Sequence, residues 1–187
     1  MDKFGIKQML TFGRKSLQEW RRDECGVSAL EFALVLPVMI TMYIGAVEIS
    51  HALTVDRRVT SVASAAADLV AQSEDVSDAD LTDIFEASTS IMLPYSAGPI
   101  SIVLSSVVAD ENNDTTVAWS SAHNGAPRAV GSSYTVPAGL TQPFSSVIVA
   151  EVSYSYTPPI GKIIIGGFNM EDTFYLRPRL SLTVEKN

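Results

Sequence analysis

Residues 27–49 read VSALEFALVLPVMITMYIGAVEI, and this stretch decides the class of the protein. Its 23 residues contain two charges, Glu31 and Glu48, both near its ends. At a rise of about 1.5 Å per residue, a helix of this length spans about 34 Å, enough to cross a hydrocarbon core of about 30 Å. The stretch therefore predicts one transmembrane helix. A helix buried in the core of a soluble protein is the alternative.

The charges around this stretch indicate its orientation. Residues 1–26 hold six of the 13 basic residues and four of the 21 acidic ones. A basic flank is retained in the cytoplasm, and Arg57 and Arg58 beyond the other end only weaken the contrast. We therefore expect a cytoplasmic N-terminus and a C-terminal part outside the cytoplasm. That part is strongly acidic and lacks the basic patches that bind phosphates, so nucleic acid is not an expected partner.

A removable secretory signal is a further alternative. The apolar core of such a signal has about 7–15 residues and is followed at once by small residues. Here the apolar run is longer, and the small residues Ala63, Ser64 and Ala65 lie 14 residues past Ile49. Release after Ala65 would give a secreted enzyme or adhesin, found as soluble protein outside the cell.

A glycine ends the charged leader at Gly26, and Glu31 follows inside the apolar run. This combination resembles the processing site of type IV prepilins. More narrowly, GVSALEFALVLPVMITMYIGAVEIS (residues 26–50) resembles the opening of the TadE-like family of tight adherence (Tad) pilus proteins. A weaker likeness covers residues 154–180, with their YSYTPPIG and LRPRL stretches, and none extends over residues 72–145.

The resemblance implies a minor pilin or pseudopilin that acts in pilus assembly or initiation and in surface adhesion. It implies that a prepilin peptidase cleaves between Gly26 and Val27, and that Glu31 and Phe32 act in subunit assembly. The implied partners are that peptidase, other pilins and pseudopilins, the inner-membrane assembly platform and the lipid bilayer. The implied location is the bacterial inner membrane or the pilus itself, and no cofactor is expected.

Two residues of the span have physical consequences of their own. A carboxylate in hydrocarbon is costly and usually marks a partner, so Glu31 is a candidate for pairing with the new α-amine of a neighbouring subunit. Alternatively, Glu31 lies close enough to the interface to reach water. Pro37 removes one helical hydrogen bond and predicts a kink. That kink is either passive or a point where the helix repacks during assembly.

The remaining chain predicts an α+β fold. Apolar residues continue at helical spacing past the span: Ala52, Val55, Val59, Val62, Ala66 and Leu69. We expect a helix over 27–71. The apolar stripe is either a core surface or a surface for partner helices, and the polar residues Arg57, Arg58, Ser61 and Asp68 face away from it.

We expect a short helix that is capped by Ser77 and Asp80 and ends before Pro94. Four antiparallel strands are expected near 100–109, 115–121, 147–156 and 173–184. Pro178 predicts that the last of these strands lies at the edge of the sheet or contains a bulge.

Three domains follow: a leader over 1–26, a helix over 27–71 and an exported α+β domain over 72–187.

Catalysis is not expected, because His51 lies at the membrane edge and His123 in a Gly/Pro-rich loop. Asp110, Asn112 and Asp114 have the spacing of calcium ligands, but Thr115 and Ser121 replace the required Gly and Glu. A polar hairpin turn fits better. The alternative function is an unprocessed, signal-anchored binding module of the cell envelope.

Overall fold

The computed structural model describes residues 25–160 and 166–187, so residues 1–24 of the proposed leader and the apolar run 163–165 lie outside it. The chain divides into two compact units after Val47. The first contributes residues 25–47, all helical. The second, Glu48–Asn187, holds a four-stranded sheet and the remaining helical and strand segments.

The predicted long helix is confirmed as α2, Cys25–Ala71. Within the second unit its buried face is made of small residues: Val55, Val59, Val62, Ala63, Ala66, Ala67, Val70 and Ala71. Leu69 was predicted to face the core but is 38% exposed, and Val70 is fully buried instead. The prediction failed at this end of the helix because the buried face is wider than one line of residues spaced three and four apart. It also includes the neighbouring alanines.

Helix α3, Asp78–Ser90, confirms the predicted short helix and its cap. The Asp80 N–H donates to the Ser77 hydroxyl at 3.2 Å, and the Ser77 N–H donates to the Asp80 carboxylate at 2.9 Å. This reciprocal arrangement satisfies two backbone donors at the helix start. The buried residues Leu81, Ile84, Phe85 and Ser88 recur at helical spacing and face the core.

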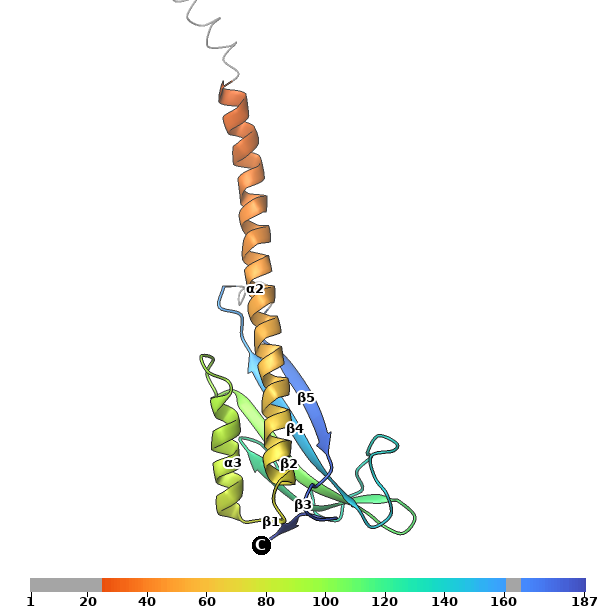
Figure 1. Cartoon of the computed structure of the whole chain (residues 1–187). Coiled ribbons are helices and arrows are strands. Elements are labelled where there is room, and N and C mark those ends of the chain that lie inside the picture. Colours follow the sequence, from red (N-terminus) through yellow and green to blue (C-terminus); the bar gives the residue numbers. More distant parts are fainter. Residues whose placement is uncertain (1–24, 161–165) are drawn as a thin grey trace, which may run out of the picture. The chain divides into compact units, whose positions relative to one another are not determined.

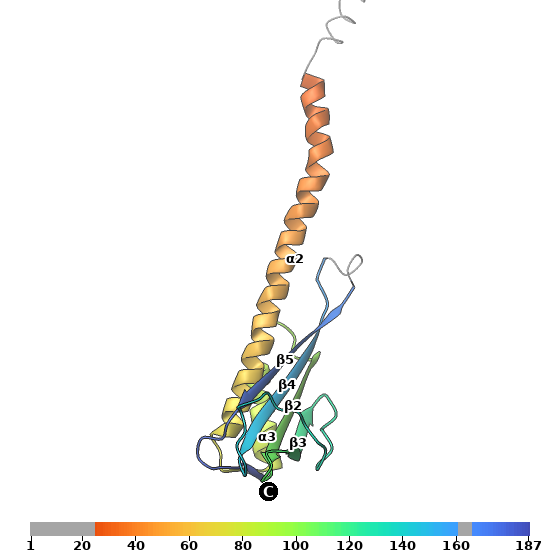
Figure 2. The same ribbon diagram turned by 90° about the vertical axis from the view of Figure 1, so that its right-hand side faces the viewer.

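The sheet has the order β3-β2-β4-β5, with every neighbouring pair antiparallel. The strands β2 (Ile100–Ala109), β3 (Thr115–His123) and β4 (Ser146–Tyr156) confirm three predicted segments. Figures 1 and 2 show α3 and the C-terminal part of α2 on the same face of the sheet. An antiparallel sheet with two helices on one face confirms the α+β class.

The fourth strand was placed wrongly. Strand β5 is Phe168–Leu176, so it begins five residues before the predicted start and ends before Pro178. Its register pairs Tyr156 with Phe168, which makes β4 and β5 a hairpin. Pro178 has no N–H for a ladder, and the strand ends before it. Just past the end of the predicted segment, β6 (Glu185–Lys186) pairs in parallel with β1 (Asp75–Val76).

The second face of the sheet carries a smaller apolar cluster that the sequence did not predict. Val107, Val117, Val147 and Val149 are buried there beneath residues of the long β3–β4 loop. The register pairs Trp119 with Ser106 and Val117 with Val107, so Ala118 forms a bulge. This extra residue places Trp119 on the helix-covered face and Val117 on the other.

Candidate assembly site

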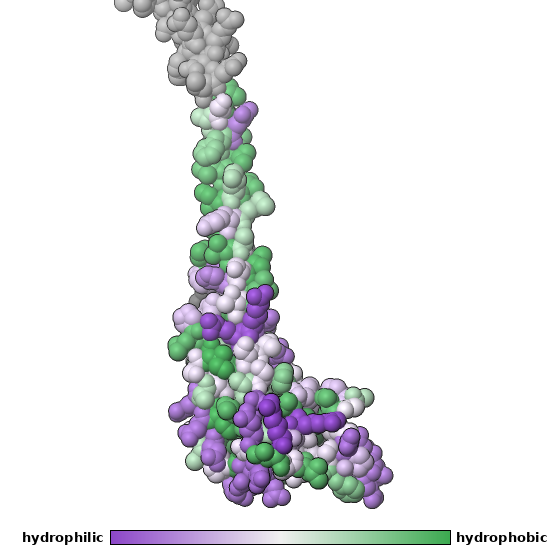
Figure 3. Space-filling view, viewed as in Figure 1, coloured by the Kyte–Doolittle hydropathy of each residue, from purple (hydrophilic) through white to green (hydrophobic). Residues whose placement is uncertain are grey.

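The first unit presents an apolar helix surface. All residues from 26 to 43 are exposed. Figure 3 shows this part of α2 as mostly hydrophobic. Glu31 is the single charge between Gly26 and Val47. The helix is long and apolar enough to cross a membrane by length and composition. A soluble core helix would be covered, so the exposed surface favours the membrane prediction.

Gly26 and Val27, the predicted processing residues, lie in the first turn of α2. A Cβ built on Gly26 meets no atom within 4 Å, so close packing does not require the glycine there.

Glu31 and Phe32 lie beyond the first turn, and Phe32 is 61% exposed. Residues four apart share a helix face, so Val27 and Glu31 lie on the same side of α2. The structure therefore places the predicted processing and assembly residues on one stretch of exposed helix.

Pro37 is accommodated inside α2, and the helix continues without interruption through it. The hydroxyl of Thr41 donates to the carbonyl of Pro37 at 2.8 Å. Membrane helices tolerate proline where nearby hydroxyl groups and small helical adjustments re-satisfy the backbone.

Glu48, the second charged residue of the stretch 27–49, is buried against its own chain. It is 7% exposed, and its Oε1 accepts a hydrogen bond of 2.7 Å from the Ile160 N–H. Ile160 belongs to the connection after β4, 112 residues along the chain. Burial, with the nearby Glu48 carboxylate as a lesser cause, raises the pKa of the Tyr156 hydroxyl. No pattern local to Glu48 could reveal so distant a partner.

Arg58 was predicted to face away but turns toward α3. Its Nη1 donates to the carbonyl of Ile91 at 2.6 Å, and its guanidinium lies 5.7 Å from the ring centre of Tyr95. Arg57, one residue earlier, is exposed as predicted. A cation beside the last carbonyls of a helix is favourable because those groups carry partial negative charge. Arg58 thus joins α2 to the end of α3.

The acidic turn after β2 uses its carboxylate internally. Asp110 Oδ1 accepts hydrogen bonds of 2.8 Å from the N–H groups of Asn112 and Asp114. This confirms the hairpin-turn prediction for residues 110–114. The histidines considered for catalysis are separate. His51 is exposed on α2, whereas His123, predicted in a loop, is the last residue of β3, and its tilted ring has its centre 5.7 Å from that of Phe85.

The tail that carries the LRPRL stretch packs against the end of α2. The Arg179 N–H donates to the Ala71 carbonyl at 2.9 Å, and the Arg179 guanidinium pairs with Asp68. Trp119 Nε1 donates to the Val184 carbonyl at 2.8 Å. These bonds satisfy groups at the end of the helix and fix the tail to the sheet.

One exposed apolar helix surface thus continues into the helix that packs on an antiparallel sheet. The sequence model of the family described as TadE-like protein matches residues 26–68. The match confirms the resemblance in the helix and supports a pilin-like protein associated with a Tad pilus, a family with a structural role. No curated protein and no solved structure matches the chain significantly.

Proposed function

We propose that the chain is a minor pilin or pseudopilin of a Tad-type pilus that acts in assembly or initiation and in adhesion. One observation carries the proposal: the segment that matches the TadE-like family begins with an exposed apolar helix whose single charge is Glu31. An exposed surface of this kind needs lipid before assembly and neighbouring helices after it. The chain is held in the inner membrane by α2, with its sheet outside the cytoplasm.

In this proposal, a prepilin peptidase cuts between Gly26 and Val27. The new α-amine has an ordinary pKa near 8 and is mostly protonated at neutral pH. It pairs with Glu31 of a neighbouring pilin or pseudopilin. An unpaired carboxylate in hydrocarbon is costly, so the ion pair selects one helix register more than it adds net stability.

Phe32 and Pro37 act in the same contact. Phe32 stands next to Glu31 and is exposed, so its ring is available to fill space between neighbouring helices. Pro37 lies about one and a half turns further on, where the missing backbone hydrogen bond makes the helix easier to adjust. The assembly platform of the inner membrane delivers the subunit, and the bilayer holds it until then.

N-terminal sequencing of the membrane-extracted protein tests the processing step. We expect a chain that begins at Val27 in cells with an active prepilin peptidase and a longer chain in cells without it. Gly26→Leu is expected to block the cut without blocking insertion. A chain that still begins at Met1 in the presence of active peptidase would refute processing and favour the signal-anchored binding module.

Pilus assembly tests Glu31. Glu31→Leu is expected to insert in the membrane normally, because it makes the span more apolar, and to reduce pili sheared from cells at least several-fold. Met39→Leu is the matched control, since it changes an exposed residue of the same helix without changing charge. Normal pili with Glu31→Leu would contradict the pairing.

A further inference from the structure

The connected end of the β4–β5 hairpin is tied to α2 through Glu48. Its described residues are 156–160 and 166–168. Within it the Ile160 N–H donates to Glu48, and the rings of Tyr156 and Phe168 meet edge-on with centres 5.5 Å apart. Figure 1 shows this end of the hairpin beside α2. The hydrogen bond therefore fixes where along α2 the hairpin ends.

Glu48 also marks the end of the apolar stretch. The 22 residues from Gly26 to Val47 span about 33 Å as a helix, close to the hydrocarbon thickness of about 30 Å. A bilayer of about 40–45 Å in total leaves about 5–8 Å of headgroups on each side. If α2 spans the membrane, Glu48 lies where the hydrocarbon meets the headgroups on the exported side. The hairpin end that Glu48 holds then lies at the same depth.

The side chains at this hairpin end suit such a place. Ile160 is 59% exposed and Phe168 is 42% exposed, while Tyr156 at the end of β4 is buried. Exposed apolar and aromatic side chains are unfavourable in water but favourable in the interfacial layer of a bilayer. The buried Glu48 carboxylate is satisfied in part by a backbone donor, so it is compatible with a poorly hydrated position.

We propose that the described end of the β4–β5 hairpin is a second membrane contact, with Ile160 and Phe168 placed among the lipid headgroups and Glu48 as the positioning residue. The occupant is lipid because the contact continues outward from the membrane-spanning segment of the same helix. The contact limits tilting of the sheet over the membrane. It requires only that α2 spans the bilayer, so it holds whether or not the chain serves a pilus.

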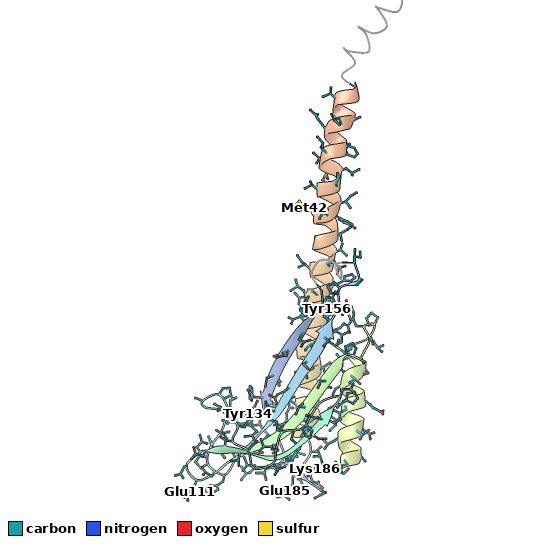
Figure 4. The ribbon with its side chains drawn as sticks, turned by 180° about the vertical axis from the view of Figure 1, so that it is seen from behind. Met42, Glu111, Tyr134, Tyr156, Glu185 and Lys186 are labelled. Atoms are coloured by element: carbon teal, nitrogen blue, oxygen red, sulfur yellow. The ribbon has the colours of Figure 1, made fainter. Side chains whose placement is uncertain are left out.

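Site-specific fluorescence in vesicles tests the contact. The full chain carries Cys25→Ser to remove its one native cysteine, together with either Ile160→Cys or Glu111→Cys, labelled with an environment-sensitive dye. Glu111 is the control, because it lies in the β2–β3 turn at the other end of the sheet from Tyr156 (Figure 4). The vesicles contain phosphatidylcholine and phosphatidylglycerol, some of it with headgroup-attached quenchers, at high lipid-to-protein ratio.

We expect quenching at position 160 to exceed quenching at position 111 several-fold and to persist as the protein is diluted in lipid. Equal quenching at the two positions overturns the proposal. A blue-shifted dye at 160 that turns water-exposed on dilution also overturns it, because a second copy of the chain then covers the hairpin end.

Variants of Glu48 test its positioning role. Glu48→Leu removes the acceptor for the Ile160 N–H and is expected to reduce quenching at 160 at least two-fold, whereas Glu48→Gln keeps an oxygen acceptor and most of the quenching. Unchanged quenching with Glu48→Leu removes Glu48 from the proposal. Should that variant misfold, the comparison of positions 160 and 111 in the Glu48 chain still decides the membrane contact. Leader cleavage and pilus counts do not enter these measurements.

Discussion

Replacing Arg58 with methionine is expected to loosen the end of α3 from α2. Arg58 Nη1 donates to the Ile91 carbonyl at 2.6 Å, and the guanidinium lies over the ring of Tyr95. Ile91 is the residue that follows the last turn of α3, where backbone carbonyls lack helical partners. Methionine keeps the apolar stem of the arginine but supplies no donor and no charge.

The expected loss of unfolding free energy is about 1–2 kcal/mol. A hydrogen bond from a charged donor contributes about 1.5–3 kcal/mol, and an arginine over an aromatic ring adds about 0.5–1 kcal/mol. An opposing contribution comes from Nε of Arg58, which is buried and has no hydrogen-bond partner among the described residues. Methionine removes that desolvated group, so the net loss is smaller than the sum of the two favourable contacts.

Chemical unfolding of the full chain in detergent micelles, followed by circular dichroism, measures this loss. Amide hydrogen exchange should also quicken in residues 89–93. Arg57→Met is the matched control, because Arg57 is exposed on the same helix and should change stability by less than about 0.5 kcal/mol. Equal losses in the two variants would refute a specific contact between Arg58 and the end of α3.

Two further predictions concern pH and the tail. Hydrogen bonds from Ser77, first its side chain and then its backbone, hold the pKa of Asp80 below its ordinary value of 3.8. Because the pKa of Asp80 is lower in the folded chain than in the unfolded chain, its ionised form stabilises the fold at pH values above the unfolded pKa. This stabilisation is lost as the pH falls through the folded pKa. Ser77→Ala should therefore lessen the fall in melting temperature between about pH 5 and pH 2. Separately, Trp119→Phe leaves the Val184 carbonyl without its donor, at about 1–3 kcal/mol, and should quicken amide exchange in residues 184–187. Unchanged exchange there would show that the bond does not hold the tail.

Much of the fold follows from local patterns. The apolar run and the helical spacing after it predicted α2 within two residues at its start. The Ser77–Asp80 spacing predicted the cap of α3, and alternating residues predicted β2 and β4. These features are set by neighbours a few residues apart, so a sequence contains the information that they need.

The contacts that the sequence did not predict join residues far apart in the chain. Arg58 has its acceptor 33 residues away, and the Glu48 contact spans 112. The loop over the second sheet face is held by Arg128, whose guanidinium pairs with Glu151 and stacks on Tyr134 at 4.7 Å. The apolar residues of this loop have no regular spacing. Its sequence therefore looks like that of a loop that does not pack on the sheet.

The assembly residues Gly26, Val27, Glu31, Phe32 and Pro37 could be proposed from sequence because they form one contiguous motif. Their placement on exposed helix agrees with that proposal, but their action depends on a peptidase and on neighbouring subunits. A single chain contains neither. The sequence therefore predicts where the site lies better than it predicts what the site binds.

Glu31 and Glu48 show how the same kind of side chain serves different purposes at the two ends of the apolar stretch of α2. Glu48 is buried and receives a backbone N–H from its own chain, so the fold itself meets much of the cost of desolvating it. Glu31 is exposed on an apolar helix surface, and any partner for it in a membrane has to come from another molecule. If this contrast is correct, exchanging Glu48 should disturb the hairpin within one chain, whereas exchanging Glu31 should disturb only the contacts between chains.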